Sequence, residues 1–286
     1  MMVVAAIGWT GFDALRKNLS SRLPAIPLVV ALTLGQVPLF AVWLATSGLP
    51  TVHSDYLWPA ALSVAINVAA NVLFVVSVRM SPLSVTIPML SFSPVFSAAI
   101  AALPPLHEIP GPAQWLGSVL VVAGALLLNA ARASGWSPRA LLLGILRERG
   151  ALVMTAVALL FALSSAVDKV ASSRSSAPLH ALVQCAGVGL VLLAALAARG
   201  ELSQLRAIGS VRSTYAAALV VGAAALGFQM SAFSVASVSA VETVKRAVGM
   251  TASQVIGRVA FGEPLYPSKW VAVLMMAVGC WLLLAA

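Results

Sequence analysis

The chain alternates long apolar segments with short polar breaks that carry proline, glycine and charge. A helix that spans a membrane needs about 20 consecutive, mostly apolar residues, and the chain contains ten such segments. They lie near residues 2–17, 25–46, 57–78, 83–103, 112–131, 151–170, 178–198, 213–234, 238–261 and 268–285. The pattern predicts an all-α integral membrane protein with ten transmembrane helices.

The composition supports a membrane protein that crosses the bilayer several times. Hydrophobic residues make up 61% of the chain and charged residues 9%, against about 45–50% and about 25% in soluble domains. The net charge of +9 is explained more simply by basic loops in the cytoplasm than by nucleic acid. We expect a multi-pass protein of the cell inner (plasma) membrane, with a small-molecule substrate, membrane lipids around it and no nucleic-acid partner.

The two halves of the chain match in order and spacing. Glu108 precedes Trp115 by the same interval at which Glu263 precedes Trp270. The segment that ends at Glu108, SPLSVTIPMLSFSPVFSAAIAALPPLHE, corresponds to SVSAVETVKRAVGMTASQVIGRVAFGE, which ends at Glu263. The predicted repeats are residues 1–131 and 151–286, joined by a connector at 132–150 whose ALLLGIL core is expected to form an interfacial helix. Five helices per repeat would insert the second repeat upside down, and inverted repeats favour a transporter with a central cavity between the halves.

The chain also resembles the drug/metabolite transporter (DMT) superfamily, in particular its ten-helix EamA-like members. The resemblance rests on Lys17, on SPLSVTIPMLSFSPVF followed by Glu108, on the VDK at 167–169, and on VKRAVGM…GRVAFGEPL. It implies that the third, fourth, eighth and ninth helices enclose the cavity, together with the first and sixth. It also implies that the fifth and tenth helices pack outside, where they often mediate a homodimer. A monomer is the alternative oligomeric state.

The orientation of the termini has two conflicting indications. Lysine and arginine gather in the loops that follow odd-numbered segments, so the positive-inside rule places both termini outside. The resemblance implies cytoplasmic termini. The counted cations are Arg16, Lys17, Arg22, Arg79, Arg132, Arg139, Arg147, Arg149, Arg199, Arg206, Arg212 and Lys269.

The ninth segment carries charges where hydrocarbon tolerates few. Glu242 and Arg246 lie four residues apart on one helical face, and Lys245 lies one step round. Such charges face the protein interior or a water-filled cavity. Either Glu242 only neutralises the two cations, or the surplus cation serves an anionic substrate or a carboxylate elsewhere, with Asp168 and then Asp13 as candidates. The same face carries Ser239, Gly249 and Ser253.

Further polar residues within the apolar segments are cavity candidates. Asn67 and Asn71 share one face of the third segment, and they either join helices by hydrogen bonds or bind a ligand. Gln229 has the same two interpretations in the eighth segment. Ser91 and Ser93 lie between Pro88 and Pro94, where a kink or break is expected because proline removes a backbone hydrogen bond.

Two aromatic residues near segment ends have competing interpretations. Trp9 lies within a turn of Asp13 and is either an interfacial anchor or a cavity residue. His180 opens the seventh segment, where an interfacial position is favoured over a role in proton transfer.

No sequence motif for catalysis or cofactor binding is present. The chain has no GxxxxGK[ST] loop for ATP and no spacing typical of a metal site, so we expect no metal, no cofactor and no enzyme activity. Transport would then use an ion or substrate gradient or run passively, and if protons are coupled the carriers would be Asp13, Asp168 and Glu242.

The leading hypothesis is a secondary transporter that moves a small metabolite or drug-like solute by alternating access. The resemblance implies that it is an exporter. The positive tendency of the cavity suggests an amphipathic or anionic solute. An alternative is a lipid flippase or scramblase whose Lys245 and Arg246 meet a lipid phosphate. A third hypothesis is a partner protein without transport activity.

Overall fold

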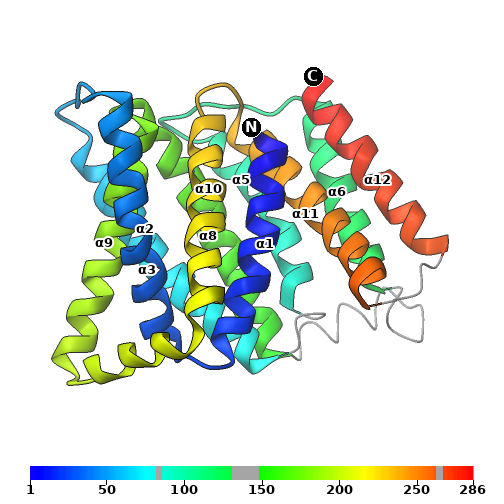
Figure 1. Ribbon diagram of the computed structural model, residues 1–286. Coiled ribbons are helices and arrows are strands. Elements are labelled where there is room, and N and C mark those ends of the chain that lie inside the picture. The colour runs from blue at the N-terminus through cyan, green and yellow to red at the C-terminus, as the bar shows by residue number, and fades with distance from the viewer. Residues whose placement is uncertain (82–85, 131–147, 262–266, 286) are drawn as a thin grey trace.

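The fold is a bundle of helices, seen in a computed structural model that describes residues 1–81, 86–130, 148–261 and 267–285 (Figure 1). The described residues contain no β-strand. In chain order the helices are α1 (Met2–Ser20), α2 (Ala25–Ser47), α3 (Leu57–Met80), η1 (Ile87–Phe92), α5 (Ser93–Ala101), α6 (Pro112–Ala130), α8 (Arg149–Ser173), α9 (Ala177–Ala198), η2 (Leu202–Val211), α10 (Arg212–Ala232), α11 (Val238–Phe261) and α12 (Pro267–Ala285).

Several of these helices are long and apolar enough to cross a membrane. Five candidate spans meet both criteria within the described residues: Ala25–Ser47, Leu57–Met80, Arg149–Ser173, Ala177–Ala198 and Leu202–Ala232. Shorter apolar helices lie at Met89–Ala101, Pro112–Leu127 and Trp270–Leu282. The predicted all-helical fold is therefore confirmed, and the apolar helices are consistent with a membrane protein. Ten crossings and the inverted repeat stay predictions.

The helices of the first half pack mainly on helices of the second half. α1 contacts α10 and α11, α8 contacts α3 and α5, α2 packs on α9, and α6 packs on α12. In the internal duplication α1 corresponds to α8, α3 to α10 and α5 to α11. The contact of α1 with α10 therefore corresponds to that of α8 with α3, and the contact of α1 with α11 to that of α8 with α5. Each contact thus has a counterpart, which agrees with the internal duplication. The repeat boundaries stay predictions, and the ALLLGIL segment lies outside the described residues.

A short 3-10 helix, η1, replaces α-helix at the proline-rich segment. Pro88 stands in its first turn and Pro94 in the first turn of α5, which follows directly. Proline lacks the N–H that an α-helix needs and clashes with the preceding turn, so the break predicted at these prolines is present. The junction between η1 and α5 carries Ser93, which is buried against α11.

Arg16 is buried within the bundle, and counting it as a loop charge was wrong. Its residue surface is only 3% exposed. The physical reason is that α1 continues to Ser20, so Arg16 faces the interior. There the guanidinium carbon lies 3.8 Å from the centre of the Phe74 ring, a cation–π contact that favours a cation in an apolar setting.

Helices α6 and α12 lie side by side at one edge of the bundle (Figure 1). Glycines allow their backbones to approach closely. A Cβ atom added at Gly279 would lie 2.6 Å from the carbonyl oxygen of Gly117, and one at Gly124 would lie 2.8 Å from that of Ala272. Small residues at such contacts are typical of helix pairs in membranes.

We predict that Gly279→Ala separates α6 from α12 and destabilises the protein by about 1–3 kcal/mol, the usual cost of overpacking. Thermal unfolding of the purified protein in detergent measures the loss. Gly111→Ala is the control, because an added Cβ there meets nothing within 4 Å. Equal unfolding temperatures for the two variants would contradict the close contact.

Candidate functional site

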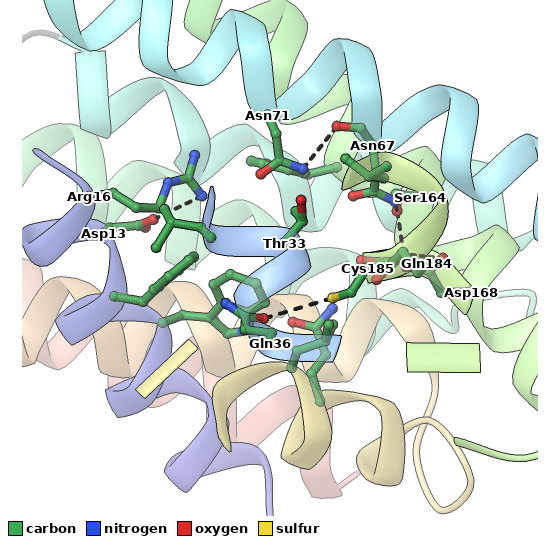
Figure 2. A pocket seen from close by; sticks show the side chains of 18 of the residues that line it. Asp13, Arg16, Thr33, Gln36, Asn67, Asn71, Ser164, Asp168, Gln184 and Cys185 are labelled. Carbon is green, nitrogen blue, oxygen red and sulfur yellow. Dashed lines mark hydrogen bonds and ion pairs between the residues drawn. The ribbon is translucent and has the colours of Figure 1, made fainter. Parts of the chain in front are cut away.

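A cavity of about 100 Å³ lies between helices of both halves (Figure 2). Asp13 and Arg16 of α1 occupy one side of it, and Asn67, Asp168 and Gln184 lie across from them. Its polar lining residues are Trp9, Asp13, Arg16, Thr33, Gln36, Asn67, Asn71, Ser164, Ser165, Asp168, Gln184, Cys185, Gln229, Lys245 and Arg246. The lining comes from α1, α2, α3, α8, α9, α10 and α11, with Leu90 of η1.

The charged face of α11 points into the protein beside this cavity. Glu242 is fully buried, and its carboxylate forms an ion pair with the Nζ atom of Lys245. Arg246 Nη2 lies 3.9 Å from the other carboxylate oxygen. Lys245 also donates a hydrogen bond of 3.2 Å to Gln229 Oε1 on α10. Glu242 therefore neutralises cations that also line the cavity, so the two interpretations of this face are compatible.

Hydroxyl groups from two other helices complete the surroundings of Glu242. Ser165 of α8 donates to Oε1 at 2.8 Å, and Ser93 donates to Oε2 at 3.1 Å. Arg246 Nε donates in turn to Ser93 Oγ at 2.9 Å. Charge-assisted hydrogen bonds of this kind offset the cost of burying a carboxylate. The network joins α11 to α5 and α8.

Asp168 has a separate set of partners, so the expectation that it would balance the surplus cation of α11 was wrong. Ser164 Oγ and Gln184 Nε2 donate to its carboxylate at 3.0 and 2.9 Å, and Ser63 Oγ donates as well. Among the described residues, the basic side chain in contact with it is His180, whose Nε2 lies 3.1 Å away. The physical reason is the position of α8, which packs on α3 and presents Asp168 to α3 and α9.

His180 is fully buried, which corrects the interfacial position favoured for it. Its other ring nitrogen, Nδ1, lies 3.4 Å from the Tyr56 hydroxyl at the start of α3. Asp168, His180 and Tyr56 therefore form a chain of contacts that begins at the cavity. The sequence placed His180 beside Pro178 at a helix start, and only the packing of α9 against α3 buries it.

The remaining candidates divide between the cavity wall and the surrounding core. Asn67 and Asn71 line the cavity and also form hydrogen bonds: Asn67 Nδ2 donates to Ser164 Oγ at 2.7 Å, and Asn71 Nδ2 to the Asn67 carbonyl at 2.9 Å. Trp9 lines the cavity, with its ring centre 5.7 Å from Lys245 Nζ. Ser91 is buried outside the lining.

Asp13 belongs to a third ionic group, with Arg16 on the next turn of α1. Arg16 Nη1 lies 3.7 Å from Asp13 Oδ1. The three described carboxylates around the cavity thus face three described cations. α11 alone carries one surplus positive charge, but the charges of the whole site sum to zero. The cavity is therefore polar in places rather than positive as a whole. The groups are Asp13, Asp168 and Glu242 against Arg16, Lys245 and Arg246.

Several cavity residues were not predicted from the sequence. Gln36 and Gln184 are single amides inside apolar segments. A lone polar residue in such a segment could have indicated a position facing the cavity. Ser164 and Ser165 also line the cavity, and their position just before the VDK motif could have indicated this. The side chain of Ser253, expected on the α11 face, lies outside the described residues.

A comparison with protein families shows which known transporters the chain resembles. The family model described as "EamA-like transporter family" matches residues 1–130. Residues 1–130 therefore resemble EamA-like transporters. This confirms the expected resemblance to the DMT superfamily over these residues. EamA-like proteins are membrane transporters rather than enzymes, and the apolar helices agree with a multi-pass membrane protein.

A solved structure is similar in fold to nearly the whole chain. It is described only as "Crystal structure of protein", with 16% sequence identity and a TM-score of 0.67. The match covers 98% of this chain and 95% of that one. At this identity the likeness shows the fold alone. A search of curated proteins found no match.

We predict that Glu242→Gln destabilises the protein by about 3 kcal/mol or more, because it leaves the buried Lys245 and the partly buried Arg246 without their counter-charge. Unfolding in detergent measures the loss, with Glu201→Gln as the control outside the cavity. The double variant Glu242→Gln/Lys245→Met removes one charge of each sign and should recover part of the stability. A Glu242→Gln variant as stable as the control would contradict the ionic role.

Proposed function

We propose that this protein is a secondary active transporter of the inner membrane that exports a small metabolite, amphipathic or anionic, by alternating access. The observation that supports it most is the cavity, which polar and charged side chains from both halves line. Charges in a membrane protein are costly, by about 2.5–3.5 kcal/mol each on insertion scales. Such a concentration of them around a cavity indicates a pathway for a polar solute.

The size of the cavity favours a small solute. Its volume of about 100 Å³ is below the roughly 300 Å³ at which pockets for drug-sized ligands begin. A metabolite of a few heavy atoms therefore fits this conformation better than a drug. The described residues give no specific support to the alternative of lipid transport.

An ionic cluster at one end of the bundle supports a gate. Lys169 of α8 forms an ion pair with Glu108, at 2.5 Å, and donates to the carbonyl oxygen of Ala236 at 2.6 Å. Glu108 also accepts a hydrogen bond of 2.9 Å from the backbone N–H of Val238. These contacts tie the loop after α5 to α8 and to the start of α11. Alternating access requires that such a connection between the halves break and reform.

Asp168 is the best candidate to couple protons to transport. Asp13 and Glu242 each form an ion pair with an arginine or a lysine, Arg16 or Lys245. Among the described residues, Asp168 instead contacts the ring of His180 and accepts hydrogen bonds from hydroxyl and amide donors. Proton binding at Asp168 would therefore change the charge of the cavity wall without breaking an ion pair with an arginine or a lysine.

We expect the purified protein in proteoliposomes to exchange at least one labelled solute from a panel of amino acids and organic acids. Counterflow of each solute into preloaded vesicles measures it, with protein-free vesicles as the control. Absence of counterflow for the whole panel would contradict the proposed substrate class.

For a transported solute, Asp168→Asn should abolish acceleration by an imposed pH gradient while counterflow continues at equal pH. The variant keeps the size of the side chain but removes the charge that a proton neutralises. Asp55→Asn, at an exposed ion pair with Arg174, is the matched control. If Asp168→Asn responds to the pH gradient as the native protein does, the proton is carried elsewhere.

A further inference from the structure

Arg16 differs from the other cations of the cavity in the partners available to it. Lys245 is held by Glu242 and Gln229, and Arg246 by Ser93 and Glu242. Arg16 Nη2 is buried and has no hydrogen-bond partner among the described residues. Its Nη1 lies 3.7 Å from Asp13, beyond hydrogen-bond distance.

The free guanidinium nitrogen needs an acceptor. A buried donor without a partner costs about 1–3 kcal/mol, and more for a charged group. Native proteins rarely leave such groups unpaired, and an exception calls for a partner from outside the protein. Because Arg16 lines the cavity, a solute in the cavity can supply that acceptor.

A second orphan donor lines the same cavity. Trp9 Nε1 is buried and has no hydrogen-bond partner among the described residues. Trp9 precedes Arg16 by seven residues, which is roughly 10 Å along a helix at about 1.5 Å per residue. The α1 wall thus offers two unpaired N–H groups, whereas the α3, α8 and α9 walls hold amides and hydroxyls that already bond to one another (Figure 2).

We propose that Arg16 binds the carboxylate of the transported solute and selects monoanions. The assignment rests on the proposed transport function and names the side of the cavity that recognises the solute. A planar guanidinium matches a carboxylate with parallel hydrogen bonds. Asp13, next to Arg16, repels a second negative charge, so a dianion is rejected by the same pair. The ligand class is a small monocarboxylate.

The test measures thermal unfolding of the full chain in detergent with three probes: lactate, its neutral isostere lactamide, and inorganic phosphate, at equal concentration and ionic strength. A ligand that binds the folded state raises the unfolding temperature. We expect lactate to stabilise the native protein more than lactamide or phosphate does. Arg16→Met should weaken the apparent lactate affinity tenfold or more, because it keeps an apolar stem against Phe74 and removes the donors.

Arg206→Met, at an exposed arginine of η2, is the matched control and should respond to lactate as the native protein does. Arg16→Lys keeps the charge but loses the planar fork, and it should weaken lactate binding at least threefold if Arg16→Met does not fold. Equal stabilisation by lactate and lactamide would overturn the proposal. So would stronger stabilisation by phosphate, or a lactate preference that survives both substitutions of Arg16.

These outcomes are separate from those of the transport assay. Lactate stabilisation that depends on Arg16, without counterflow of any solute, would support the carboxylate site and contradict the proposed transport function. Counterflow that is equal for solutes with and without a carboxylate, and that is unchanged in Arg16→Lys, would support transport and contradict the carboxylate site.

Discussion

The arrangement of the bundle depends on one buried carboxylate, Glu242. Lys245 and Arg246 balance its charge, and hydroxyls of Ser93 and Ser165 bond to its two oxygens. Those contacts join α11 to α5 and α8, which come from different halves of the chain. Because each partner would be costly to bury alone, the group forms as a unit and fixes these helices beside the cavity.

The cavity inherits its chemistry from this arrangement. The ion pairs around it lie within single helices, Asp13 with Arg16 on α1 and Glu242 with Lys245 and Arg246 on α11, so the site is close to neutral as a whole but polar at each point. Asp168 relies on hydroxyl and amide donors and on the ring of a histidine. Arg16 relies on aromatic rings and a distant carboxylate. The surroundings of Asp168 suit the binding of a proton, and those of Arg16 suit the binding of an anion. Both side chains face the cavity through which a solute would move.

The sequence predicted the features that depend on local pattern. The charged face of α11 followed from helical spacing, and the break near Pro88 and Pro94 followed from the missing backbone donors. Features that depend on tertiary packing were missed. Arg16 looked like a loop cation because nothing local reveals the ring of Phe74 above it, and His180 looked interfacial because its partner Asp168 lies on another helix. Segments far apart in the sequence decide these positions.

The most direct test of the account is whether the cavity opens to each side of the membrane in turn. Asn71→Cys, in a chain with Cys185 and Cys280 replaced by alanine, places one thiol in the lining. A membrane-impermeant thiol reagent applied to each side of oriented proteoliposomes should label it from both sides. A transported solute should change the two labelling rates in opposite directions. Labelling from only one side, at a rate that the solute leaves unchanged, would contradict alternating access through this cavity.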